Sequence, residues 1–165
     1  MVLGMSLSAF TTLHVIISLI GIVSGFVVLY GMLTSTDFKP WTGIFLATTV
    51  LTSVTGFFFP VDGLKPSHIV GIISLVFLAA AVLGLYAFGL RGPWRWVYVI
   101  SAVVALYLNT FVAVVQSFMK LPFLQPLAPT QSEPPFQIAQ GVLLVLFIIF
   151  GVLAVRKFHP APTAA

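Results

Sequence analysis

The sequence of 165 residues contains no cysteine and very few charged residues. Without cysteine, the chain cannot form disulfides, thiolate metal sites, iron–sulfur clusters or a cysteine nucleophile. Charged residues make up only 6% of the chain, whereas about a quarter of the residues are charged in a typical soluble domain. Because 60% of the residues are also hydrophobic, water cannot be the main solvent, and the composition indicates an integral membrane protein.

Long apolar runs fill most of the sequence. A helix needs about 20 apolar residues to cross a membrane, and five runs meet or approach that length. Hydrocarbon offers the backbone no hydrogen-bond partner, so each run must be a helix that satisfies its own amides. The sequence therefore predicts one all-α transmembrane domain over residues 1–165, a bundle of five helices. The helices are expected at about 9–33, 41–59, 69–90, 94–118 and 136–155.

The distribution of cations predicts an orientation. With five spans the connectors alternate between the two sides of the membrane, and lysine and arginine favour the cytoplasmic side. An N-terminus outside and a C-terminus in the cytoplasm places five cations inside and leaves Lys65 and Lys120 outside. The five inside are Lys39, Arg91, Arg95, Arg156 and Lys157. Cations at helix ends face lipid headgroups, so the net charge of +4 does not indicate nucleic-acid binding.

Polar side chains collect in the half of the bundle that this orientation places outside. A primary amide such as Asn109, deep among apolar residues, needs a partner from another helix or from a ligand. The sequence therefore predicts a ligand pocket near the periplasmic face, lined by His14, Asp62, His68, Asn109, Gln116, Lys120, Glu133 and Gln140. No arrangement of nucleophile, base and acid accompanies it, and no catalytic residue is assigned. The leading interpretation is a non-enzymatic binding or accessory protein.

The two histidines of this half offer an alternative function. Bis-histidine ligation of haem b needs two imidazoles that face each other across the porphyrin, and His14 and His68 are the candidates for an electron-transfer protein. Zinc or copper held by His14, Asp62, His68 and Glu133 is a further option, but no pair has metal-ligand spacing within a helix. No metal site is therefore assigned.

Small residues suggest a third interpretation, an oligomeric channel or scaffold subunit that associates with itself or with a larger membrane complex. Gly21 and Gly25 form a GxxxG pair, which lets two membrane helices approach closely. The fourth helix carries a stripe of small residues that becomes polar toward Asn109 and Gln116. Both features are also common inside single bundles.

Two segments resemble a known pattern. LYLNTFVAVVQ, residues 106–116, followed by APTQSEPPF, residues 128–136, is similar to small multi-pass inner-membrane proteins of bacteria. The resemblance implies a bacterial inner-membrane location and suggests that Asn109, Gln116 and Glu133 belong together; it carries over no activity. Five prolines between residues 119 and 135 restrict the backbone, so this connector is expected to be a rigid polar lid on the outer surface.

Overall fold

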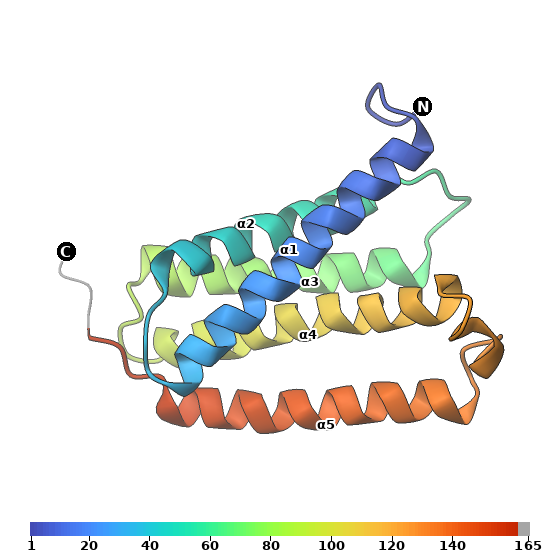
Figure 1. Cartoon of the computed structure of the whole chain (residues 1–165). Coiled ribbons are helices and arrows are strands. Elements are labelled where there is room, and N and C mark those ends of the chain that lie inside the picture. Colours follow the sequence, from blue (N-terminus) through green and yellow to red (C-terminus); the bar gives the residue numbers. More distant parts are fainter. Residues whose placement is uncertain (162–165) are drawn as a thin grey trace.

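The computed structural model describes residues 1–161, which contain five α-helices and no strand. The elements are α1 (Leu7–Leu33), α2 (Lys39–Gly56), α3 (Pro66–Val82), the π-helical turn η1 (Leu83–Ala87), α4 (Trp94–Lys120), the short 3-10 helix η2 (Gln125–Leu127) and α5 (Pro134–Lys157). Consecutive α-helices run in opposite directions along one bundle (Figure 1). The expected all-helical fold is therefore confirmed.

Four of the five helices in the described part of the chain are long and apolar enough to cross a membrane. They are α1, α3 continued by η1, α4 and α5, and many of their large apolar side chains are exposed, as contact with lipid requires. The fifth helix, α2, has 18 residues and does not meet this measure. Its composition explains the difference, because threonine and serine replace apolar residues along much of its length.

The hydroxyl groups of α2 are satisfied mainly within the helix. Thr48 donates to the Ile44 carbonyl at 2.6 Å, and Thr52 donates to the Thr48 carbonyl at 2.8 Å. A hydroxyl bonded to the preceding turn exposes little polarity to its surroundings. The helix also packs closely on α1 and contacts α3, so its neighbours cover a large part of it.

Prolines and one cap set the helix ends. Pro66 begins α3, and Pro134 and Pro135 form the first turn of α5, where the missing N–H groups would have no helical partner. Ser6 caps α1 by accepting a bond from the Ala9 amide at 3.2 Å. These positions lie within a few residues of the predicted boundaries.

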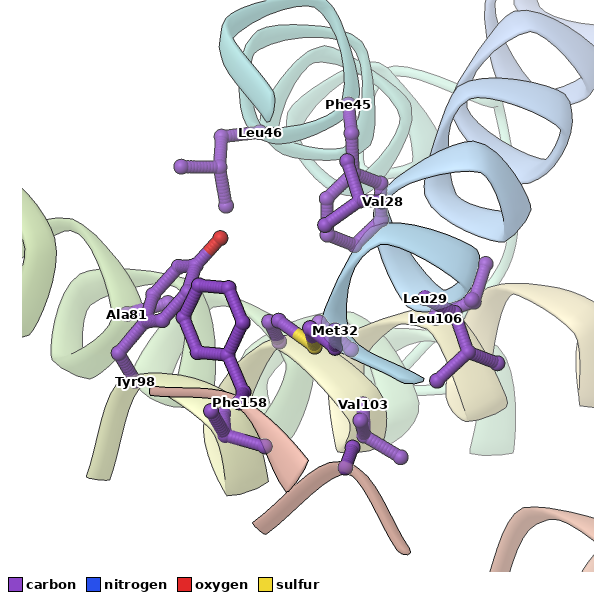
Figure 2. Close-up of a cluster of buried hydrophobic side chains, with 14 of the residues drawn as sticks. Val28, Leu29, Met32, Phe45, Leu46, Ala81, Tyr98, Val103, Leu106 and Phe158 are labelled. Carbon is purple, nitrogen blue, oxygen red and sulfur yellow. The ribbon is translucent and has the colours of Figure 1, made fainter. Parts of the chain in front are cut away.

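The largest apolar cluster lies where α1, α2 and α4 meet the end of α5. Figure 2 shows Val28 and Met32 of α1 between Phe45 of α2 and the α4 side chains. Phe158, which follows α5, folds back into the same cluster beside Tyr98, with 6.1 Å between the ring centroids. The last residues of α5 are thereby fixed to the bundle.

The GxxxG pair on α1 is used inside the chain. A Cβ at Gly25 would lie 2.5 Å from Leu106 Cδ1, and one at Gly21 would lie 3.1 Å from Thr49 Oγ1. Ala102 and Ala105 of the small-residue stripe on α4 are buried inside the bundle. These two faces hold the bundle together and are not available for contacts with a second copy.

The alternating helices define two ends of the molecule. The N-terminal end carries the N-terminus and the connectors 57–65 and 121–133, and the C-terminal end carries the connectors 34–38 and 88–93 and residues 158–161 (Figure 1). Each end has a cavity of its own.

Candidate ligand site

A cavity of about 100 Å³, largely apolar but with several polar groups in its wall, lies between α1, α2, α3 and α4, in the half of the bundle nearer the N-terminal end. Its walls combine one histidine, one asparagine and several hydroxyl groups with small and apolar residues. The lining residues are His14, Ser18, Thr52, Ser53, Gly56, Ser67, Val70, Gly71, Ser74, Leu108, Asn109 and Val112. Polar walls of this kind among apolar helices can hold water or a small polar molecule.

His14 lines this cavity, and a hydroxyl and an aromatic ring fix its imidazole. Its Nδ1 lies 2.7 Å from Thr55 Oγ1, and the Thr55 hydroxyl donates its single proton to the Leu51 carbonyl at 2.7 Å. When the Thr55 hydroxyl keeps this bond it accepts from Nδ1–H, and in that tautomer the neutral imidazole has its lone pair on Nε2. The ring is also fixed by Phe59, edge to face at 5.1 Å between centroids.

Asn109 is held by α1. Its Oδ1 accepts from the Ser18 hydroxyl at 3.0 Å, whereas the contact from its Nδ2 to the Ser18 carbonyl is long, 3.5 Å. The amide is 8% exposed, so it has few other partners within the bundle. Nearby, the buried Thr49 hydroxyl has no hydrogen-bond partner at all among residues 1–161. Both groups would gain from a polar molecule beside them, because an unpaired buried donor costs about 1–3 kcal/mol.

Hydroxyl groups of α2 and α3 complete the wall. Ser53 donates to Ser74 Oγ at 3.3 Å across the two helices. Sequence reasoning placed neither serine at the site, although Ser74 follows Ser67 and Gly71 at steps of four and three residues, which put all three on one face of α3. Serine and threonine are frequent in ordinary helix contacts, which hides this signal.

The eight residues predicted for the pocket lie in several places. His14 and Asn109 line the cavity, and the other six do not. Gln140 instead donates to the Phe111 carbonyl at 3.2 Å between α5 and α4, while its buried Oε1 has no partner among residues 1–161. The side chain of Gln116 makes no hydrogen bond within the described residues, and Asp62 and Lys120 are exposed near the connectors. Residues 119–135 do not line this cavity either.

His68 is a buried helix cap. Its Nδ1 accepts from the Lys65 amide at 3.0 Å, and its ring stacks on Phe57 with 5.4 Å between centroids. An imidazole that accepts through Nδ1 carries its proton on Nε2, so that nitrogen has no lone pair for a metal.

Haem b would need a rearrangement of His68 to bind between the two histidines. His14 has a suitable lone pair, but His68 would have to release the Lys65 amide and leave Phe57. The cavity at His14, about 100 Å³, is also smaller than the roughly 300 Å³ at the lower end of ordinary ligand pockets. For the separate alternative of a zinc or copper ion, residues 1–161 contain no group of three histidine or acidic side chains close enough to hold a metal ion.

Glu133 organises its own connector. Its carboxylate accepts from the Thr130 hydroxyl at 2.7 Å, from the Thr130 amide at 3.2 Å and from the Ser132 amide at 3.1 Å. These bonds, the Thr130 hydroxyl first, lower the pKa of Glu133 below its usual range. None of the groups that lower it is a cation, so Glu133 shapes the loop without the help of Lys120.

A second and larger cavity, about 650 Å³, opens at the C-terminal end. It lies between the start of α2 and the segment from η1 to the start of α4. The lining residues are Asp37, Lys39, Thr42, Leu85, Tyr86, Ala87, Phe88, Gly89, Arg91 and Trp94. Sequence reasoning treated the cations of this end as membrane anchors, because no helical periodicity links the separate segments that form this cavity.

No family model, curated protein or solved structure matches the chain.

Proposed function

We propose that this protein is a multi-pass inner-membrane protein of bacteria that binds a small, neutral, polar ligand in the cavity between α1 and α4. The observation that supports the proposal is the convergence of His14, Ser18 and Asn109 on one cavity. Polar groups inside a membrane bundle are expensive to leave unpaired and commonly mark a binding site or a pathway.

The cavity limits the size and charge of the ligand. A water molecule takes about 30 Å³, so a volume of about 100 Å³ accommodates roughly three waters or a molecule of about four heavy atoms. A neutral imidazole such as that of His14 has one acceptor nitrogen, and Asn109 Nδ2 is an underused donor, so the ligand should carry both a donor and an acceptor. No charged side chain lines the cavity, which disfavours an ion.

Acetamide is a suitable probe, because it has four heavy atoms and both kinds of hydrogen-bonding group. We expect it to shift the ring ¹⁵N signals of His14 saturably when it is titrated into the full-length protein in nanodiscs. The best fragments gain at most about 1.5 kcal/mol per heavy atom, and a realistic Kd is near ~1 mM.

The matched variants are Gly56→Ala and Gly43→Ala, both on α2. A Cβ at Gly56 would enter the cavity wall at 3.9 Å from His14 Cε1, an ordinary contact, and a Cβ at Gly43 meets nothing within 4 Å. Both changes remove a helical glycine, but only Gly56→Ala reduces the cavity. Acetamide binding should weaken about tenfold in Gly56→Ala, a change of about 1.4 kcal/mol, and stay normal in Gly43→Ala. Equal binding by all three proteins, or no saturable shift in the parent, would refute the proposal.

We also propose that all five helices cross the membrane, with the N-terminal end in the periplasm. The positive-inside rule supports this, since the C-terminal end carries Lys39, Arg91, Arg95, Arg156 and Lys157. Alkaline phosphatase, which matures only in the periplasm, should be active when inserted in the connector 121–133 and inactive when fused to the C-terminus. The reverse pattern would invert the orientation and place the polar cavity nearer the cytoplasm.

A further inference from the structure

The cavity at the C-terminal end has the composition of a binding site for a phospholipid headgroup. We propose that it binds a phospholipid whose headgroup carries both a phosphate and a primary ammonium group, as an ethanolamine phospholipid does. The site shares no lining residue with the cavity between α1 and α4, so the lipid proposal and the proposed function are tested independently. Its volume, about 650 Å³, lies within the ordinary range of ligand pockets, about 300–1,000 Å³.

Two cations at this cavity are available for a phosphate. Lys39 lies in the first turn of α2 and Arg91 in the connector 88–93, and both are exposed. Within residues 1–161 neither side chain donates a hydrogen bond to a protein group, in contrast to Arg95, which donates twice to backbone carbonyls. A phosphate can take bonds from both cations, and arginine suits it through two parallel N–H groups.

One carboxylate gives the cavity a second kind of partner. Asp37 lines it together with the two cations, so the side-chain charges at the wall sum to +1. A plain anion would be attracted by Lys39 and Arg91 and repelled by Asp37. A headgroup with a phosphate and an ammonium matches all three, because the ammonium can pair with the carboxylate.

The connector that carries Arg91 is fixed. Gly89, Leu90 and Gly92 all have positive φ angles, 57°, 60° and 55°, and the Leu90 amide donates to the Gly84 carbonyl at 2.9 Å. A leucine in the left-handed region is strained, and such strain persists only where the surrounding structure holds it. Here the π-helical turn η1 and the partly buried Leu90 side chain hold it, so Arg91 projects from a preorganised turn.

Aromatic residues indicate a lipid as the source of the phosphate. Phe88 stacks on Trp94 with 4.0 Å between centroids, and Tyr86 is 62% exposed. Tryptophan and tyrosine are typical of the level where the membrane meets water. Exposed apolar residues of the α3–η1 segment, Val82 and Leu83, continue from this level toward the lipid side of the bundle. A phospholipid can therefore place its headgroup in the cavity and its acyl chains along this segment.

Native mass spectrometry of the delipidated full-length protein tests the proposal with three probes: phosphatidylethanolamine, phosphatidylglycerol and inorganic phosphate. We expect one phosphatidylethanolamine to be retained at a concentration about tenfold lower than phosphatidylglycerol, the effect of one charge-assisted contact. The double variant Lys39→Gln/Arg91→Gln should lose about tenfold or more in affinity for both lipids. Asp37→Asn should remove the preference for phosphatidylethanolamine and leave phosphatidylglycerol binding intact.

Lys157→Gln is the matched control, since it removes a cation of the same end that does not line the cavity, and its lipid retention should equal that of the parent. Helix content and melting temperature confirm that each variant is folded. Retention of both lipids by the double variant at parental concentration would overturn the site. Displacement of the lipid by millimolar inorganic phosphate would assign the cavity to a soluble anion. An unchanged preference for phosphatidylethanolamine in Asp37→Asn would show that Asp37 does not contact the ammonium group. Either result overturns the proposal as stated.

Discussion

Replacing Gly25 with alanine is expected to lower the free energy of unfolding by about 1–3 kcal/mol, the usual cost of overpacking a well-packed interior. The new Cβ would lie 2.5 Å from Leu106 Cδ1 and 2.9 Å from two atoms of the Phe45 ring. Leu106 and Phe45 are each 1% exposed, so neither side chain has free space to move into. α1 would have to move away from α2 and α4. This shift would also disturb the Ser18–Asn109 contact, which lies about two helical turns from Gly25.

The comparison with Gly141→Ala isolates this effect. Gly141 lies on α5, and a Cβ there meets nothing within 4 Å, so the same chemical change should be neutral or slightly stabilising. Unfolding by increasing denaturing detergent gives the two free energies. Shortening the opposing side chain with Leu106→Val should recover part of the loss in the Gly25→Ala background, a coupling that a double-mutant cycle measures. Equal stability of Gly25→Ala and Gly141→Ala would show that α1 does not pack as described.

Replacing Arg95 with leucine is expected to cost about 3 kcal/mol or more, because two hydrogen bonds from a charged group are lost and each is worth about 1.5–3 kcal/mol. The guanidinium Nη1 donates to the Val155 and Phe158 carbonyls, both at 2.8 Å. These carbonyls belong to the end of α5, where the helix dipole also favours a positive charge. The contact joins α5 to α4 and keeps Phe158, which is 2% exposed, in the apolar cluster.

The release of this end can be observed directly. In Arg95→Leu the amides of the last turn of α5 should exchange hydrogen faster, and Phe158 should become accessible to chymotrypsin. The stability and amide protection of Arg95→Lys should lie between those of the parent and those of Arg95→Leu, because a lysine presents a point charge and cannot reproduce the geometry of the guanidinium. Lys157→Gln is the control, as this cation makes no hydrogen bond through its side chain within residues 1–161. Parental stability and protection in Arg95→Leu would exclude the proposed role of this contact.

The bundle itself could be predicted from the sequence, because length, hydropathy and proline act locally. An apolar run must become a helix wherever it meets hydrocarbon, and Pro66, Pro134 and Pro135 fix where two of the helices begin. The same reasoning counted α2 among the spans, although this helix falls short of the length and hydropathy of the other four. With 18 residues α2 has the length of a short span, but its threonines lower its hydropathy. Its packing on α1 and α3, which covers part of its surface, is visible only in the tertiary structure.

The sites depended on tertiary structure. Sequence reasoning selected polar residues by their depth along each helix, and depth does not determine which way a side chain turns or which neighbour it meets. His14 and Asn109 meet at one cavity because α1 crosses α2 and α4 closely at Gly21 and Gly25. Glu133 stays in its own loop, because the nearby Thr130 and Ser132 groups satisfy it first. The cavity at the opposite end arises where a π-helical turn and left-handed residues bring two separate connectors together, and no periodic pattern in the sequence encodes that meeting.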